Sequence, residues 1–242
     1  MASPLPGSSP APRAGRPRVL CVIPARGGSK RLPGKNLAPL AGKPLLAHSI
    51  EQALAAPSVE RVVVSTDDPE IARAARERGA EVIERPAELA TDEAPSEGAL
   101  LHALDTLEAR EGYVPDLVLF LQATAPVRRP EDLEAAIATL EREGADSLLS
   151  VVESRRFHWR QDAGGARPVD YDPRRRPRSQ ERPPDLVENG SIYLVRPAVL
   201  RREGCRLGGR IALYRMGAES AVDVDGPLDL ALCAAALSWR DR

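Results

Sequence analysis

Short apolar runs alternate with amphipathic stretches over most of the chain. Runs rich in Val, Leu and Ile predict strands at residues 18–23, 61–65, 81–84, 117–121 and 147–152. Apolar residues at helical spacing predict helices between them, at residues 44–55, 69–78, 95–109 and 130–143. Alternation of this kind predicts an α/β fold with a doubly wound, mostly parallel sheet in three layers.

The alternation stops after Glu153. Residues 155–188 contain many Pro, Arg and Asp residues and little periodicity, so we expect a functional loop or an appendage there. Periodic apolar patterns then return and predict strands at 190–195, 210–216 and 221–225 and a closing helix at 227–239.

Composition narrows the class of protein. The chain has 242 residues, is 43% hydrophobic and 29% charged, and carries a net charge of -1. These values are typical of a globular protein with no general attraction to nucleic acid or to a membrane surface. Three scattered cysteines form no disulfide framework or metal motif, which favours the cytoplasm. Residues 1–17 lack an apolar h-region, so we expect a disordered tail before a folded domain at 18–242.

The first predicted strand leads directly into a glycine-rich basic loop, IPARGGSKRLPGKN. Its cations are Arg26, Lys30, Arg31 and Lys35. Glycines let a backbone approach phosphates, and ligands of parallel α/β sheets bind at the carboxyl ends of strands. The spacing fits neither a Walker A loop nor GxGxxG. The loop therefore predicts a nucleoside-triphosphate site of another kind, with a solvated basic turn as the alternative.

Two further stretches carry candidate chemistry. LQATAPVR follows the strand at 117–121, which places Gln122 to bind a polar substrate and Arg128 to pair with an anion, unless the stretch is only a capping turn. Asp223 and Asp225, two apart on a predicted strand, would share one side and could hold Mg²⁺. Spacing alone favours an exposed strand face, or Asp225 as a helix cap.

Six stretches occur in a fixed order: IPARGGSKRLPGKN, STDD, RPAELATDEAPS, LQATAPVR, ENGSIY and VDVDGPLDL. Together they resemble the acylneuraminate cytidylyltransferase family, the CMP-sialic acid synthetases. The resemblance covers residues 18–242 and implies a Rossmann-like fold of the nucleotide-diphospho-sugar transferase type. It also implies transfer of CMP from CTP to the anomeric hydroxyl of a nine-carbon 2-keto-3-deoxy sugar acid, with release of pyrophosphate.

The resemblance gives roles to individual residues. It implies catalytic roles for Arg26, Lys30 and Lys35, and a sugar contact for Gln122. Asp223 and Asp225 match the family's Mg²⁺-binding aspartates, which reverses the preference from spacing. The residues that would bind CTP are Ala25, Arg26, Gly27, Gly28, Ser29, Lys30, Lys35, Asn36, Arg85, Ala94 and Ser96.

The stretch 155–188 matches the region that leaves the domain in the family and packs on a second subunit, which implies a homodimer. Arg178 and Gln180 are therefore substrate candidates. Many family members have Arg immediately before this Gln, whereas this chain has Ser179, so Arg182 is a second candidate cation.

The acceptor has alternatives: pseudaminic, legionaminic, deaminated neuraminic or 3-deoxy-octulosonic acid. A catalytically silent nucleotide-binding protein is a more remote alternative. Loss of the loop cations or of the paired aspartates would mark such a protein, and the sequence retains both sets.

Overall fold

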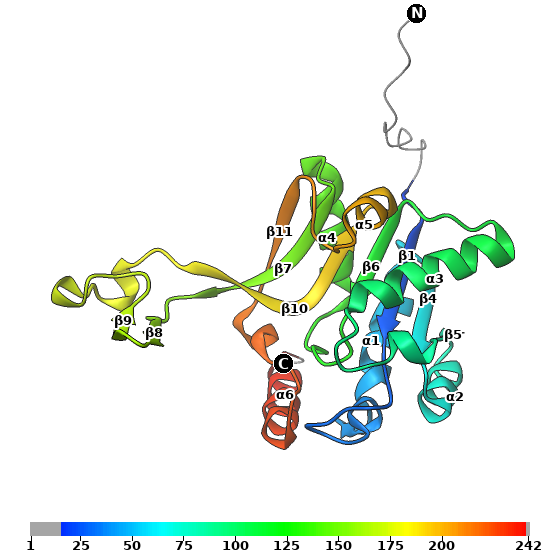
Figure 1. Cartoon of the computed structure of the whole chain (residues 1–242), viewed down its shortest axis with the longest axis horizontal. Coiled ribbons are helices and arrows are strands. Elements are labelled where there is room, and N and C mark those ends of the chain that lie inside the picture. Colours follow the sequence, from blue (N-terminus) through cyan, green and yellow to red (C-terminus); the bar gives the residue numbers. More distant parts are fainter. Residues whose placement is uncertain (1–15, 241–242) are drawn as a thin grey trace, which may run out of the picture.

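The structure, a computed structural model, describes residues 16–240 (Figure 1). Its main sheet has seven strands in the order β11-β7-β10-β6-β1-β4-β5. Only β10 runs antiparallel to its neighbours in this sheet, so the predicted mostly parallel α/β fold is confirmed. The strands are β1 Val19–Pro24, β4 Val59–Thr66, β5 Glu81–Glu84, β6 Leu117–Leu121, β7 Ser147–Ser154, β10 Asp185–Val195 and β11 Ile211–Met216. Residues 1–15 of the expected tail lie outside the described residues.

Helices cover both faces of this sheet. Buried residues of α1, α2 and α4 join the apolar cluster on one face, and those of α3 and α5 join the cluster on the other. The helices are α1 Leu45–Leu54, α2 Pro69–Glu77, α3 Ser96–Glu111, α4 Pro130–Glu143, α5 Pro197–Glu203 and α6 Pro227–Arg240. None of the helices within residues 16–240 is long and apolar enough to cross a membrane.

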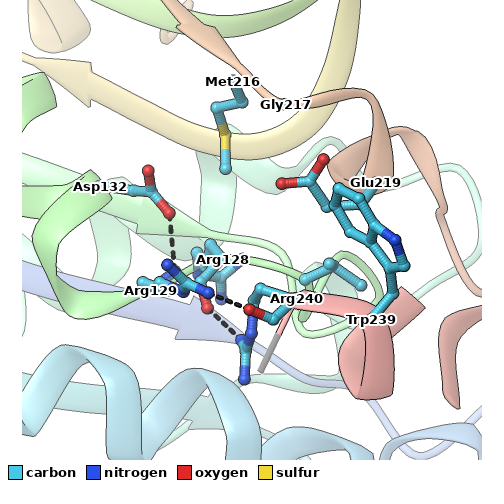
Figure 2. Close-up of a pocket in the computed structure, with 9 residues that line it drawn as sticks. Arg128, Arg129, Asp132, Met216, Gly217, Glu219, Trp239 and Arg240 are labelled. Carbon is cyan, nitrogen blue, oxygen red and sulfur yellow. Dashed lines mark hydrogen bonds between the residues drawn. The ribbon is translucent and has the colours of Figure 1, made fainter. Parts of the chain in front are cut away.

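The closing helix α6 packs beside the loop that follows β6. Cys233 and Leu237 of α6 are buried in a small apolar cluster that also contains Val224. At the end of the helix, Arg240 donates a hydrogen bond of 2.5 Å to the carbonyl oxygen of Arg128 (Figure 2). The helix that follows the paired aspartates is therefore fixed against the carboxyl end of the sheet.

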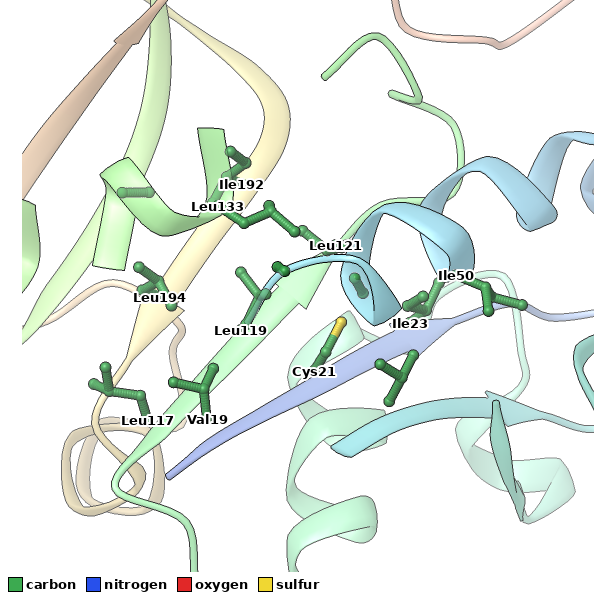
Figure 3. Packing of buried hydrophobic residues seen from close by; sticks show 14 of the residues in the cluster. Val19, Cys21, Ile23, Ile50, Leu117, Leu119, Leu121, Leu133, Ile192 and Leu194 are labelled. Carbon is green, nitrogen blue, oxygen red and sulfur yellow. The ribbon is translucent and has the colours of Figure 1, made fainter. Parts of the chain in front are cut away.

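The strands that lead to this edge are buried on both faces. Val19, Cys21 and Ile23 of β1 point into the cluster drawn in Figure 3, while Leu20 and Val22 point into the opposite one. Successive side chains of a strand face opposite ways, so a strand between two helix layers is apolar throughout. Burial of each large aliphatic side chain contributes about 1.5–3 kcal/mol. The loop after β1 therefore starts from a fixed point.

The region expected to be aperiodic contains an arm (Figure 1). β7 and β10 continue past the sheet as an antiparallel ribbon that pairs Ser154 with Asp185. Beyond the ribbon lies a hairpin of β8 (Trp159–Asp162) and β9 (Gly165–Pro168). All eight hairpin residues are wholly or half exposed, so the sequence there carries no burial pattern from which strands could be predicted.

The predicted strand at 221–225 is wrong. Ala218–Ala221 is a 3₁₀ helix, η5, and the residues that follow are irregular up to α6. Val224 is fully buried and donates its N–H to the carbonyl oxygen of Thr124 at 2.8 Å. The alternation of Val and Asp thus reflects a loop pinned to the body of the protein. The argument that Asp223 and Asp225 share one side of a strand does not hold.

The remaining short elements connect these parts. The strands β2 (Pro39–Leu40) and β3 (Lys43–Pro44) form a small hairpin before α1. The other 3₁₀ helices are η1 Lys35–Leu37, η2 Ala87–Leu89, η3 Pro173–Arg175 and η4 Ser179–Glu181.

Candidate active site

The loop after β1 is held in one shape by polar contacts. The amide of Asn36 donates to the carbonyl oxygen of Arg26 at 3.0 Å, and the N–H of Gly27 donates to Oδ1 of Asp67 at 3.1 Å. A Cβ atom at Gly27 would lie 2.6 Å from Oδ2 of Asp68, whose side chain caps α2. The close approach of the loop to the start of α2 therefore requires glycine at this position.

A pocket of about 190 Å³ lies where this loop meets the end of β6. Its lining brings together residues from three distant parts of the chain, including the N-terminus of α3, where the helix dipole favours anions. Six residues predicted for the site line it: Arg26, Ser29, Lys35, Asn36, Ser96 and Gln122.

A second pocket of about 350 Å³ shares Gln122 with the first. It is lined from β10 by Glu188 and Tyr193 and from the loop before α6 by Asp223. Gly190 lies between Glu188 and Tyr193 in β10 and has φ 69°. A Cβ atom at this position would lie 2.9 Å from Oε1 of Gln122. The pairing register of β10 with β7 breaks over the same residues, which aims this segment at Gln122.

A third pocket, of about 530 Å³, extends along the loop on the opposite side. Arg26 and Ser29 line both this pocket and the first one, whereas Lys30 and Asp92 line only this one. The three pockets therefore follow one another along the carboxyl edge of the sheet.

All four loop cations are paired with carboxylates. Asp92 contacts Arg26 at 2.7 Å and also Lys30, and Asp225 contacts Arg31 at 2.7 Å and Lys35 at 3.3 Å. The ammonium of Lys30, followed by the guanidinium of Arg26, holds the pKa of the Asp92 carboxyl below its usual value. Each loop cation thus has a carboxylate partner, although Lys30 and Arg31 remain largely exposed, and this pairing weakens the alternative of a simple basic turn.

Asp223 and Asp225 are the candidate ligands of a Mg²⁺ ion. Asp223 lines the second pocket, and Lys35 holds the same segment by donating to the carbonyl oxygen of Val224 at 2.8 Å. The N-terminus of α6 is capped by Asp229, which accepts from the N–H of Asp225 at 2.9 Å. Asp225 is therefore not the helix cap that spacing suggested. Both of its carboxylate oxygens pair with loop cations, so an Mg²⁺ ion bound there would have to replace Arg31 or Lys35.

Another group of potential metal ligands lies at the base of the arm. His158, Asp170 and Asp185 bring one ligand atom each within 4.8 Å of one another. The guanidinium of Arg182 already pairs with both aspartates, at 2.5 Å in each case. This charge compensation makes the group a structural ion-pair cluster.

Arg85 and Ala94 do not line the three pockets. Arg85 is buried and donates to Oγ of Ser65 at 3.2 Å. Burial lowers the pKa of its guanidinium, Asp67 opposes the shift, and Arg26 adds to it. The N–H of Ala94 donates to Oγ1 of Thr91 at 3.2 Å, in the loop before α3.

A family profile described as cytidylyltransferase matches residues 20–165. The chain belongs to the cytidylyltransferase family. This assignment confirms the resemblance carried by the motifs. The profile covers the basic loop and Gln122, while the paired aspartates lie beyond it.

Several relatives of this cytidylyltransferase are similar over most of its length. It is 35% identical over 230 residues to N-acylneuraminate cytidylyltransferase A of Danio rerio, covering 92% of this chain and 52% of that protein. It is 31% identical to post-translational flagellin modification protein B of Campylobacter coli, covering 87% of this chain and 91% of that protein. The chain spans about half the length of the first curated relatives it matches.

A solved structure supports the fold of this cytidylyltransferase. CMP:2-keto-3-deoxy-manno-octonic acid synthetase complexed with CTP superposes with a TM-score of 0.66 at 26% identity. The match covers 92% of this chain and 99% of that chain.

Arg128 does not have its expected role. It is 1% exposed and donates to the carbonyl oxygen of Ala125 at 2.5 Å and to Oγ of Ser191 at 3.3 Å. A further hydrogen bond to Oγ of Ser49 reaches α1. Arg128 therefore clamps the turn after Gln122 to the fold of this cytidylyltransferase, and it is not available to an anion.

The arm candidates lie away from the pockets of their own chain. Arg178, which precedes η4, and Gln180, which lies within it, are exposed, and neither lines a pocket described above. The arm projects from the body of the cytidylyltransferase (Figure 1).

Arg206 is a site residue that the sequence did not reveal. It lines the second pocket, with its guanidinium 4.7 Å from the ring centre of Tyr193 and 5.4 Å from that of Phe120. Its Nη1 donates to Glu97 at 2.8 Å. Arg206 lies in an irregular segment between α5 and β11, where neither a motif nor a periodic pattern marks it. Asp92 was also missed, although it belongs to the quoted motif RPAELATDEAPS.

Proposed function

We propose that this cytidylyltransferase transfers CMP from CTP to the anomeric hydroxyl of a nonulosonic, sialic-type acid and releases pyrophosphate. The observation that carries the proposal is the position of Gln122 in both the first and the second pocket. Arg26 and Lys35 line one side of this junction, and Asp223 lines the other. A donor phosphate and an acceptor hydroxyl would therefore meet beside the paired aspartates.

The named relatives support the choice of substrates. The Danio rerio relative is named for N-acylneuraminate, and the solved neighbour is named for 2-keto-3-deoxy-manno-octonic acid and was complexed with CTP. Both names describe activation of a sugar acid. The higher identity to the N-acylneuraminate relative places the nine-carbon acceptor first and 3-deoxy-octulosonic acid second.

In the proposed reaction the acceptor hydroxyl attacks the α-phosphorus of CTP in line, and pyrophosphate leaves along the basic loop. Arg26, Lys30 and Lys35 stabilise the charge that develops on the leaving group. Lys35 is the strongest of these, because its side chain is only 15% exposed and water screens it least. Gln122 orients the acceptor, and this positioning makes the reaction effectively unimolecular. Mg²⁺ held by Asp223 and Asp225 would supply neutralisation of phosphate charge and a lower pKa for the hydroxyl.

The proposal includes a cytoplasmic homodimer in which the arm of one subunit completes the acceptor pocket of the other. The exposed positions of Arg178 and Gln180 on a projecting arm support this arrangement. Cys21, Cys205 and Cys233 are all free thiols, as in proteins of a reducing compartment.

A substrate panel tests the proposal. Purified protein is assayed for pyrophosphate release with each nucleoside triphosphate and with N-acetylneuraminic, pseudaminic, legionaminic, deaminated neuraminic and 3-deoxy-octulosonic acids, with and without Mg²⁺. We expect activity with CTP, a nine-carbon acid and Mg²⁺ together. Activity with UTP or ATP but not CTP would contradict the cytidylyl assignment. Activity with the eight-carbon acid alone would show that 3-deoxy-octulosonic acid, and not a nine-carbon acid, is the acceptor.

A further inference from the structure

Asp92 forms ion pairs with two cations of the loop that is proposed to bind phosphate. One of its carboxylate oxygens lies 2.7 Å from Arg26, and the other contacts Lys30. These two cations and Asp92 line the same pocket of about 530 Å³. The carboxylate thus satisfies, with two oxygens, the same two donors that a bound phosphate would need.

We propose that Asp92 is an internal counter-ion that competes with phosphate groups for Arg26 and Lys30. This proposal rests on the proposed function, because it takes the triphosphate of CTP as the competing anion. In the free protein Asp92 holds the loop cations together and prevents their mutual repulsion. When the triphosphate binds, its oxygens replace the carboxylate, and after transfer the carboxylate returns and promotes the release of pyrophosphate.

The position of Asp92 in the chain suits such an exchange. It lies between η2 and α3, outside any helix or strand, so it can move without breaking a ladder of backbone hydrogen bonds. Its side chain is 28% exposed, and the Lys30 side chain is 78% exposed. Water therefore reaches the pair, and partly solvated ion pairs are weak enough to be replaced by a multiply charged anion.

Asp225 differs from Asp92 in a useful way. Asp225 pairs with the other two loop cations, Arg31 and Lys35, but it also belongs to the proposed metal site. Its pairing would change when Mg²⁺ binds, so its substitution would mix two effects. Asp92 lies in the pocket that does not contain the paired aspartates, and its effect on anion binding can be measured without metal.

The alternative role for Asp92 is a rigid strut that shapes the loop for phosphate. The two roles predict opposite results. If Asp92 competes with phosphate, its removal strengthens anion binding, because the cations lose an internal partner. If Asp92 is a strut, its removal weakens anion binding, because the cations are no longer held in position.

The test is calorimetric binding of inorganic pyrophosphate and of CTP, in EDTA, to the whole protein and to Asp92→Asn and Asp92→Ser. We expect both variants to bind pyrophosphate about three- to tenfold more tightly, because two surface ion pairs no longer compete with it. The gain should shrink as salt rises from low to high concentration, because salt screens the competing carboxylate and the phosphate alike. Unchanged or weaker binding in both variants would overturn the proposal.

Glu93→Gln is the matched control. It removes the same charge from the neighbouring residue, which is exposed and has no ion pair among residues 16–240. We expect less than a twofold change in pyrophosphate affinity from this variant, and an equal gain in Glu93→Gln would overturn the specific role of Asp92. If the unaltered protein binds UTP as well as it binds CTP, the proposed cytidylyl function fails. If it prefers CTP and Asp92→Asn does not tighten binding, only the counter-ion proposal fails.

Discussion

The two halves of the site are built in different ways. All four cations of the donor half come from one continuous loop, Ala25 to Asn36, and its pocket is completed by Ser96 at the N-terminus of α3 and by the end of β6. The acceptor half is assembled from the end of β6, the bulged middle of β10, the segment after α5 and the loop before α6. The charges of the donor half are therefore specified by local sequence, whereas every part of the acceptor half comes from a different element.

The halves also differ in their charges. The donor half holds four cations, each paired with one of two aspartates. The described residues that line the acceptor pocket include a single cation, Arg206, which is held by Glu97 and by two aromatic rings. A polyanion is thus bound by many exchangeable charges on one side. Selection of a sugar acid on the other side depends on shape and on few polar contacts.

The strongest test of the donor half is Lys35→Ala. Lys35 is less exposed than Arg31, the other loop cation that pairs with Asp225. Its ammonium also donates to the carbonyl oxygen of Val224 at 2.8 Å. Its loss removes charge from the leaving group and loosens the segment that carries the paired aspartates. We expect kcat/KM for CTP to fall about 10³-fold, near 4 kcal/mol of transition-state stabilisation, in a pyrophosphate-release assay.

Lys43→Ala is the control for this variant. Lys43, before the start of α1, pairs with Glu51 in the second half of that helix and lines none of the three pockets of the site. We expect less than a twofold change in kcat/KM. A similar loss in both variants would mean that the basic loop is not the catalytic half.

Asp223→Asn tests the junction between the halves. Removing one carboxylate ligand should lower kcat about 10²-fold and raise the Mg²⁺ concentration needed for half-maximal rate. The unfolding midpoint in urea should change little, because Asp223 is exposed and its carboxylate is not a helix cap. Asp105→Asn, at a surface ion pair with Arg201, should leave the Mg²⁺ dependence unaltered. An unchanged Mg²⁺ requirement in Asp223→Asn would remove that residue from the proposed metal site.

The same contrast explains what could be predicted from the sequence. The central strands were predicted because burial on both faces makes them apolar throughout, and the crossover helices because burial of one face imposes a helical period. The cations of the loop were predicted because a strand followed by Gly, Ser and Lys has a direct physical meaning. The Val/Asp alternation at 221–225 gave the wrong element, since a pinned loop buries alternate residues as a strand does.

Other features had no local signal. Arg206 reaches the acceptor pocket only because α5 returns its segment to the sheet. Arg128 has the charge of an anion ligand, and only tertiary packing turns it into a buried clamp. The exposed hairpin of the arm lacks periodicity because it buries no face within its own chain. Residues whose role depends on packing between distant segments are those that sequence patterns miss.

A mixing experiment tests whether the acceptor half is shared between subunits. Arg178→Ala should raise the KM for the sugar acid about tenfold, as loss of one charge-assisted contact does, and leave the KM for CTP unchanged. Mixing it with Lys35→Ala in equal amounts, under conditions that exchange subunits, should restore about a quarter of the sites. If Arg178 acts in its own subunit, mixing restores nothing beyond the average of the two variants.

The smallest expected effects come from two glycines, one in each half. Ala at Gly190 must adopt φ 69° and meets Oε1 of Gln122 at 2.9 Å, so we expect a loss of about 1 kcal/mol in the free energy of unfolding. The displaced Gln122 should raise the KM for the sugar acid severalfold. Gly27→Ala, which meets Oδ2 of Asp68 at 2.6 Å, should instead raise the KM for CTP. Urea unfolding and initial rates measure these effects. If both variants raise the same KM, the two halves are coupled through Gln122 and cannot be treated as separate units.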